Sequence, residues 1–575
     1  MSPFTLVIRN GTVLDGTGGA PRLVDIGIAG DRIVSVGHGL PRATDEIDAE
    51  GMIVTPGFVD IHSHYDGQAS WGSSFEPSSS HGVTTVVIGN CGVGFAPCRA
   101  EDRESLIRLM EGVEDIPEIV MAAGLPWTWE SFPEYLDAVA GIPHEIDVAA
   151  QVPHCALRVY VMGQRGVDRE IATHDDLSEM ARLTREAVRA GALGVATSRT
   201  VIHRTPDGAL IPSHDAAEAE LHALAGALAA EGRGVFQLAM DLEESRVDES
   251  FAMLHRIAER SGRPVSFSLV QPLDQPNVWK AMLAKLSHSS NIGLPIRAQV
   301  FGRPVGMLLG LDLSFNPFSF YPSYREIAHL GLPERVAELA RPERRARILA
   351  EEPAKDGPPF LAHLSRFKWM FELDNPPNYE PHLSRSIAAL GALRGLTPQE
   401  IAYDLLLERG GKSIIFLPRA NYSDGTLDAV LAMMKHPATV LGLGDGGAHC
   451  GVICDASLPT FMLTYWSRDR QSERLPLSWT IRALTAEPAA AVGLLDRGLI
   501  APGYKADLNV IDHNALTLDA PTMISDLPAG GRRLHQSARG YVATIVNGLV
   551  VRRNDAPTGV LPGHLIRGNQ VGPAQ

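Results

Sequence analysis

The sequence predicts an α/β protein, namely a (β/α)8 TIM-like barrel with a small β-sandwich domain built from both chain termini. Two observations carry this prediction. In the middle of the chain, near-continuous apolar strands alternate with amphipathic helices, whereas both ends contain only short strands. Apolar strands that alternate with helices form a parallel sheet covered on both faces. About eight such units between Thr55 and Leu495 favour a barrel.

The two ends of the chain share a pattern of short β-strands. Near the amino terminus, branched residues alternate with turn pairs such as Asn10-Gly11, as hairpins require. The stretches APGYKADLNVID and GYVATIVNGLVVRR repeat this pattern near the carboxyl terminus. We therefore assign residues 1–55 and 496–560 to the β-sandwich and residues 56–495 to the barrel.

The barrel strands are predicted from short apolar segments, and helical segments that end in glycine lie between several of them. A doubly wound sheet would instead carry a glycine-rich phosphate loop early in the chain, and the sequence has none there. The segments are TTVVIGN, EIDVAAQVPH, LGVATSR, GVFQLAMD, PVSFSLVQ and TVLGLGD. A helical insertion at about residues 311–434, rich in proline and aromatic residues, interrupts the series. Such insertions form lids or oligomer contacts, so a homo-oligomer stays open.

Composition narrows the class of protein. The 575 residues are 45% hydrophobic, which is enough for a large core, and the net charge of -16 argues against nucleic acid or an anionic membrane as a partner. No apolar run is long enough to span a membrane, and the amino terminus does not resemble a secretory signal. Five cysteines, an odd number, fit a reducing compartment. We expect a cytoplasmic enzyme that acts on a small molecule.

Candidate metal ligands stand at three predicted strand ends. In TPGFVDIHSHYD, His62 and His64 are two residues apart, so on a strand both imidazoles point to the same side. The next strand ends in NCGVG with Cys91, and the last ends in GLGDGGAH with Asp445 and His449. Catalytic groups of a barrel converge at these ends. Two imidazoles, a thiol and a carboxylate suit zinc, and Asp445 is placed to take a proton from water.

Each of these residues also has a simpler interpretation. The histidine pair could be solvated loop residues, Cys91 could be a small buried hydrophobe, and Asp445 could cap a turn. Cys450 and Cys454 have the wrong spacing for a zinc knuckle, so we interpret them as packing residues. Only the combination of three strand ends favours the metal site.

These motifs resemble the amidohydrolase superfamily, and within it the D-aminoacylases, or N-acyl-D-amino acid deacylases. The resemblance rests on TPGFVDIHSHYD, GVTTVVIGNCGVG, GALGVATSR, GLGDGGAH and APGYKADLNVID, and it covers most of the chain outside the insertion. It implies a metal-bearing barrel with a β-sandwich. His62 and His64 would be ligands, Cys91 a ligand or bridge, and Asp445 the catalytic base that activates water against an amide carbonyl.

The sequence departs from that family at two strands. The family takes two further histidine ligands from the fifth and sixth strands, but here these read GVFQLAMD and PVSFSLVQP. Gln237 and Ser268 stand near the expected positions, and LGVATSR offers no lysine as a bridge. We therefore expect a divergent member with one zinc ion rather than two, and another divalent metal in place of zinc stays open. His62, His64 and Asp445 would hold it, with or without Cys91.

Substrate-binding residues are predicted from location alone. A substrate carboxylate would pair with a guanidinium in bidentate geometry. Arg199 at the fourth strand end and Arg303 in VFGRPVG are candidates, as are Tyr321 in the insertion and His449.

The leading functional prediction is metal-dependent hydrolysis of the amide bond in an N-acyl amino acid, with the D-isomer favoured, or in a similar small amide. One alternative keeps the metal and changes the bond to a cyclic imide, lactone or carbamate. The other is a barrel that binds a ligand without catalysis.

Overall fold

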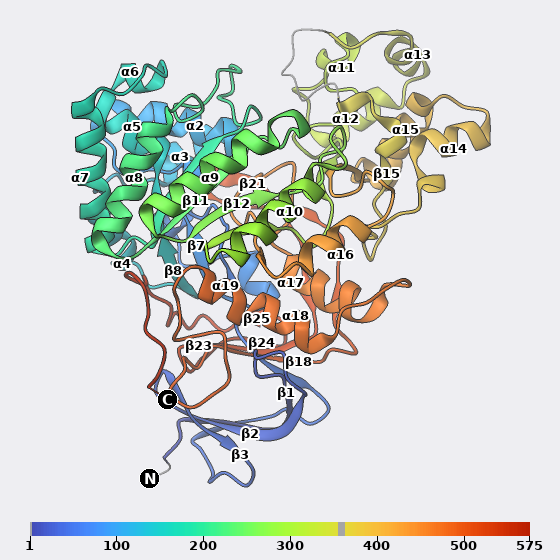
Figure 1. Cartoon of the computed structure of the whole chain (residues 1–575). Coiled ribbons are helices and arrows are strands. Elements are labelled where there is room, and N and C mark those ends of the chain that lie inside the picture. The colour runs from blue at the N-terminus through green and yellow to red at the C-terminus, as the bar shows by residue number, and fades with distance from the viewer. Residues whose placement is uncertain (1–2, 355–362, 575) are drawn as a thin grey trace.

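The computed structural model describes residues 3–354 and 363–574, which form a mixed α/β fold (Figure 1). Its centre contains two parallel sheets with the strand orders β6-β7-β8 and β9-β10-β11-β12-β13-β17. These strands are buried on both faces, as their apolar sequences predict. Their bounds are β6 (Phe58–Asp60), β7 (Val83–Ile88), β8 (Asp147–Ala150), β9 (Val152–Pro153), β10 (Gly194–Arg199), β11 (Val235–Met240), β12 (Val265–Leu269), β13 (Ile296–Val300) and β17 (Thr439–Leu441).

The two parallel sheets adjoin each other at both edges. Only Gln151 separates β8 from β9, and its backbone N–H donates to Ile88 O at 2.9 Å. At the opposite edges, Ser63 after β6 and Gly446 after β17 form a parallel bridge. The chain positions that follow the first and last strands therefore lie beside each other.

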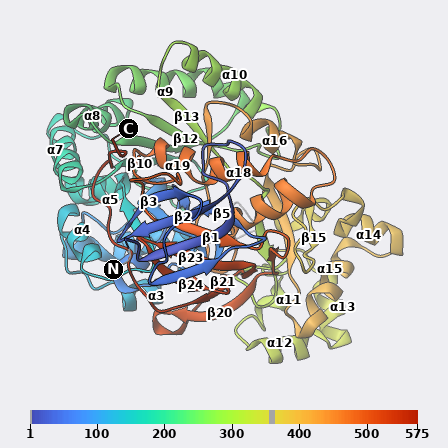
Figure 2. The same cartoon turned by 90° about the horizontal axis from the view of Figure 1, so that it is seen from below.

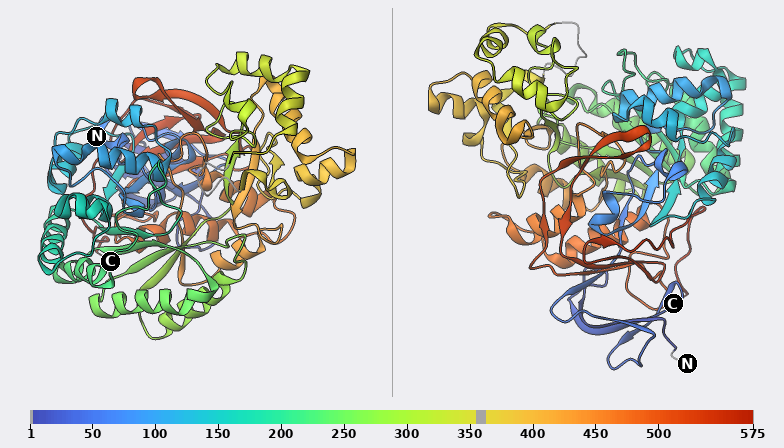
Figure 3. Two further views of the ribbon diagram at one scale, coloured as in Figure 1. Left: turned by 90° about the horizontal axis from the view of Figure 1, so that it is seen from above. Right: turned by 180° about the vertical axis from the view of Figure 1, so that it is seen from behind.

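Helices follow most of these strands and cover the outside of the sheets (Figures 1 and 3). Two of the helices expected to end in glycine are His174–Ala190 and Glu218–Glu231, which Gly191 and Gly232 follow. Thr173 opens the first with a capping box that includes Asp176, so local sequence explains where the helix begins. The bounds of the main helices are α2 (Arg103–Glu114), α5 (His154–Met162), α7 (His174–Ala190), α8 (Glu218–Glu231), α9 (Val247–Ser261), α10 (Val278–Asn291), α18 (Leu477–Leu484) and α19 (Ala486–Ala491).

Both termini contribute to one nine-stranded sheet, which lies below the parallel sheets in Figure 1 and faces the viewer in Figure 2. Its order is β25-β24-β23-β18-β5-β1-β2-β3, and β4 pairs with β1. Ile8, Ile26 and Val510 lie in its own apolar core. The bounds are β1 (Leu6–Val13), β2 (Arg22–Ala29), β3 (Arg32–Gly37), β4 (Asp45–Asp48), β5 (Ile53–Pro56), β18 (Leu508–Ile511), β23 (Tyr541–Val546), β24 (Leu549–Arg553) and β25 (Ala556–Pro557).

The insertion forms a lobe at one side of the parallel sheets (Figures 1 and 3). It differs from the helical expectation, because an antiparallel sheet of order β14-β16-β15 lies among its helices and begins before residue 311. Its apolar residues make a separate core. The elements are β14 (Val305–Leu309), α11 (Pro322–Arg325), α12 (Leu332–Leu339), α13 (Pro342–Ala350), β15 (Phe371–Glu372), α14 (Ile387–Arg394), α15 (Pro398–Leu407), β16 (Ile415–Ala420) and α16 (Asp428–Met434).

Two further observations bear on the expected environment. Within residues 3–354 and 363–574, no helix combines the length and apolarity needed to cross a bilayer. All five cysteines are buried, and none forms a disulfide.

Candidate metal centre

Backbone hydrogen bonds join the segment after β6 to the segment after β17. Asp445 N donates to His62 O at 3.0 Å, and His64 N donates to Gly446 O at 2.7 Å. The carboxyl ends of parallel strands meet at one edge of a sheet, which is where functional groups of α/β proteins gather. The two predicted histidines and the predicted aspartate are therefore held in one place by main-chain contacts.

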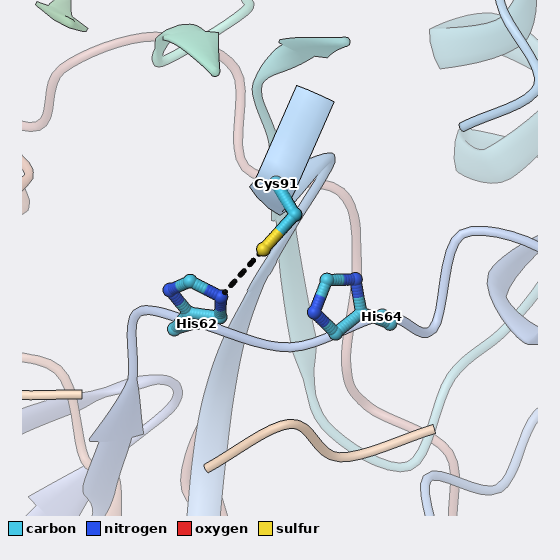
Figure 4. A group of neighbouring side chains, drawn as sticks. All are labelled: His62, His64 and Cys91. Atoms are coloured by element: carbon cyan, nitrogen blue, oxygen red, sulfur yellow. Dashed lines mark hydrogen bonds between the residues drawn. The ribbon is translucent and has the colours of Figure 1, made fainter. Parts of the chain in front are cut away.

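Four side chains converge at this edge. The donor atoms of His62, His64 and Cys91 all lie within 4.8 Å of one another, and Figure 4 shows the thiol pointing toward the two imidazoles. Cys91 Sγ is 3.4 Å from His62 Nε2. Asp445 Oδ1 lies 3.5 Å from Nε2 of His62 and 3.5 Å from Nε2 of His64. The structure thus brings together all four residues expected to bind metal.

The backbone around these side chains is strained. Cys91, Asp445 and His449 have φ values of 55°, 46° and 55°, in the left-handed region that L-residues with a side chain rarely adopt. Gly89 is required beside Cys91, because its φ is +84° and a Cβ there would lie 2.2 Å from Gln151 O. Strain of this kind gathers at functional sites, where it directs particular side chains into place.

The site is buried, and burial sets its electrostatics. Burial lowers the pKa of His62 to about 4, so its imidazole is neutral near pH 7. Burial also raises the pKa of the Cys91 thiol to about 12. For Asp445, burial disfavours the carboxylate, but the hydrogen bond to His64 and the charges of nearby histidines outweigh it and hold the pKa well below its usual range.

Two residues that sequence reasoning missed contact the outer nitrogens of the imidazoles. Gln299 Oε1 on β13 lies 2.7 Å from His62 Nδ1. Glu114 Oε1 at the end of α2 lies 3.3 Å from His64 Nδ1, and this carboxyl group is buried. Burial lowers the pKa of His64, but Glu114, Asp445 and Cys91 together raise it well above its usual value. Neither residue lies in a motif, because only the fold brings β13 and α2 to the histidines.

These residues fit a bound divalent metal ion. Two imidazole nitrogens, a thiol and a carboxylate oxygen are the ligand types zinc takes in proteins, at the right number for one ion. Gln299 hydrogen-bonds Nδ1 of His62, and the Glu114 carboxyl group lies beside Nδ1 of His64 at 3.3 Å. Nε2 of each ring therefore faces the centre, as in metal-bound histidines whose outer nitrogen has a partner.

The structure corrects two predicted substrate contacts. Arg303 is buried, and its guanidinium pairs with Asp455 and also donates to Ser457 Oγ at 3.0 Å and Cys454 O at 2.6 Å. It is therefore already occupied and cannot bind a substrate carboxylate. Tyr321 is buried in the core of the insertion, where the centre of its ring lies 5.3 Å from that of Phe318.

The other predicted contacts have different surroundings. Arg199 ends β10, but it bonds His214 O at 3.4 Å and Met253 Sδ at 3.1 Å on α9, which lies behind the sheet. His449 lies at the centre, with Nε2 3.7 Å from Glu114 Oε2, and burial lowers its pKa to about 4. Gln237 is buried on β11, and among the described residues neither atom of its carboxamide has a hydrogen-bond partner.

A buried imidazole pair and thiol, with a partly exposed carboxylate, lie at the carboxyl ends of parallel strands, which is the arrangement that metal-dependent α/β hydrolases use. The chain belongs to the amidohydrolase family, whose model matches residues 45–552. This match confirms the superfamily resemblance predicted from the motifs.

The individual proteins that the chain resembles include D-aminoacylases and related deacylases. The chain is 26% identical to the D-aminoacylase of Alcaligenes xylosoxydans xylosoxydans, over 98% of each chain. It is 27% identical to the N-acyl-D-glutamate deacylase of the same organism, over 98% of this chain and 96% of that one. The crystal structure of N-acyl-D-glutamate deacylase from Bordetella bronchiseptica, complexed with zinc and a phosphonate inhibitor, superposes with a TM-score of 0.62 at 23% identity, over 98% and 99% of the chains. That structural likeness shows a shared fold.

Proposed function

We propose that this protein is a metal-dependent deacylase that hydrolyses the amide bond of an N-acyl amino acid, with the D-isomer as the preferred substrate. The convergence of His62, His64, Cys91 and Asp445 carries the proposal. Membership of the amidohydrolase family supports the reaction class, and the names of the two Alcaligenes relatives support the substrate class.

The proposed fold around this site is a closed barrel. The two parallel sheets adjoin at both edges, so we infer that they are the two arcs of one (β/α)8 barrel over residues 56–495. The sheet from both termini would then be the smaller domain. Asn421 on the insertion donates to Arg303 O at 3.2 Å and accepts from Gln271 N at 2.8 Å, so the insertion contacts the carboxyl ends of the strands β12 and β13.

Each residue of the site has a role in this proposal. A divalent ion, here zinc, would supply Lewis-acid polarisation of the amide carbonyl and would lower the pKa of water. His62, His64 and Cys91 would hold a single ion together with Asp445. The pKa of Asp445 lies well below its usual range, so its carboxylate is ionised. Its Oδ1 lies 3.5 Å from Nε2 of both histidines, which places it to accept the proton of the attacking water. Asp445 would then return that proton to the leaving amine.

A substrate panel on purified protein with measured zinc content tests the proposal. N-acetyl-D-amino acids should be hydrolysed faster than their L-isomers, and Asp445→Asn should remove the activity. A cyclic imide and a lactone belong in the panel, because β11 and β12 carry no histidine and a changed site could serve another leaving group. Activity on those compounds with none on N-acyl amino acids would replace the proposed substrate class.

A further inference from the structure

Gln299 makes a hydrogen bond that determines which nitrogen of His62 carries hydrogen. Its Oε1 lies 2.7 Å from His62 Nδ1, and both side chains are buried. A carboxamide oxygen can only accept, so Nδ1 must donate, and Nε2 is left with a free lone pair. Nε2 is the nitrogen that faces Cys91 Sγ at 3.4 Å and Asp445 Oδ1 at 3.5 Å.

We propose that Gln299 is a positioning residue that locks His62 in the tautomer able to bind metal. The inference rests on the proposed metal centre and adds to it a residue on a different strand, β13, which lies outside the sequence motifs.

The orientation of the amide matters because the opposite orientation would block the site. If Gln299 presented its NH2 group to His62, Nδ1 would have to accept, and the ring hydrogen would sit on Nε2. That tautomer has no lone pair on Nε2, the nitrogen that faces the proposed metal position. In the structure the NH2 group instead donates to Ser266 Oγ on β12 at 3.2 Å. The amide of Gln299 therefore lies between Ser266, which accepts from its NH2 group, and His62, which faces its oxygen.

A glycine after the neighbouring strand β17 leaves space for the Gln299 amide. Gly442 follows β17 beside Gln299, and a Cβ on Gly442 would lie 3.1 Å from Gln299 Oε1 and 3.4 Å from Gln299 Cβ. A side chain there would crowd the amide. The glycine thus permits the amide to lie between Ser266 and His62.

Gln299 and Glu114 give the two imidazoles unlike partners. His64 has a carboxylate beside its outer nitrogen, whereas His62 has a neutral amide. A neutral acceptor orients the ring without adding negative charge next to it. The role of Gln299 is therefore geometric, and a carboxylate in its place should retain it.

The test compares metal affinity in Gln299→Leu and Gln299→Glu, measured without substrate by competition of Zn²⁺ with a chelator and by the visible spectrum of bound Co²⁺. Loss of a partner of this kind typically weakens metal binding about 10- to 100-fold, which is expected for Gln299→Leu. Gln299→Glu keeps an oxygen acceptor for Nδ1–H and should stay within about threefold of the wild type. Melting of the metal-free variants checks that they fold.

Gln271→Leu is the matched control. Gln271 is also a buried glutamine next to β12, but its amide donates to Asp424 at 2.9 Å rather than to a proposed metal ligand. Its loss should leave metal affinity unchanged. Wild-type affinity in Gln299→Leu, or equal weakening in the Leu and Glu variants, would overturn the inference. A wild-type protein that binds no metal would overturn the proposed metal centre itself, so the two failures are distinguishable.

Discussion

Cys91 Sγ and His62 Nε2 lie 3.4 Å apart although 29 residues separate them in sequence. The contact joins the segments that follow the first two parallel strands, β6 and β7, and faces the carboxylate of Asp445, which is partly exposed. A thiol whose pKa is raised to about 12 by burial is protonated at neutral pH, and a bound cation is what would favour its thiolate.

Replacement of this thiol should weaken the metal site without unfolding the protein. Cys91→Ser keeps the size of the side chain but removes the soft ligand, so zinc affinity should fall by at least about tenfold. The Co²⁺ form should also lose its sulfur-to-metal charge-transfer band. Cys98→Ser, a change at another buried cysteine, should alter neither measurement. An unchanged charge-transfer band in Cys91→Ser would exclude Cys91 as a ligand.

Asp445 should be needed for turnover. Asp445→Asn keeps the size of the side chain but cannot accept a proton, and loss of a general base typically costs about 10²- to 10⁴-fold in rate. The effect should appear in kcat more than in KM. A variant at Asp455, which pairs with Arg303 outside the metal centre, should affect stability rather than the pH profile of turnover. A kcat for Asp445→Asn within about threefold of the wild type would refute its role as base.

Gly442→Ala should weaken metal binding from a distance. Its Cβ would crowd Gln299 and disturb the bond to His62, so zinc affinity should fall by a smaller factor than in Gln299→Leu. A Cβ on Gly226 in α8 would meet no packed neighbour within 4 Å in the described part of the chain, which makes Gly226→Ala the matched control. Tighter or unchanged zinc binding in Gly442→Ala would show that a Cβ at position 442 does not disturb the Gln299 amide.

A buried charge cluster between α5 and α8 should contribute more to the free energy of unfolding than an exposed ion pair does. Glu220 on α8 contacts His154 Nε2 at 2.7 Å and pairs with Arg158 on α5, and all three side chains are buried. Glu220→Gln leaves Arg158 without a counter-charge, which should cost about 3–5 kcal/mol in urea unfolding at pH 7. Glu218→Gln breaks the partly exposed pair between α8 and Arg256 on α9 and should cost under about 1 kcal/mol. Equal costs would contradict this account.

The same cluster predicts a dependence of stability on pH. Burial raises the pKa of Glu220, but the bonds to His154 and Arg158 outweigh it and lower the pKa from 4.5 to about 2. A group with a lowered pKa in the folded state stabilises that state above pH 4.5, and this contribution is lost as pH falls toward 2. Glu220→Gln should therefore flatten the fall in stability between these pH values. An unchanged slope in unfolding measurements would refute the assignment.

The ligand residues were predictable because they lie in short motifs at strand ends. His62 and His64 share a side of one segment, and Cys91 and Asp445 end other strands, so parallel topology alone brings them together. Gln299 and Glu114 were not predictable, since their contacts depend on how β13 and α2 pack against that edge. Arg303 was predicted to bind substrate from its position alone, because the sequence does not show that its guanidinium pairs with Asp455.

The insertion was the least predictable part of the fold. Its helices follow from local sequence, but β14 ends at Leu309 and β16 begins only at Ile415, so the two strands pair solely through tertiary structure. Strand pairing over such a separation leaves no local periodic signal.

The central claim is that one metal ion at this site drives amide hydrolysis, and titration of the metal-free protein with Zn²⁺ tests it most directly. Hydrolysis of an N-acetyl-D-amino acid should rise from background to a plateau at about one zinc per chain, and chelation should reverse it. Asp445→Asn should remain at background throughout the titration. Full activity in metal-free protein, or zinc binding without hydrolysis of any N-acyl amino acid, would contradict the account.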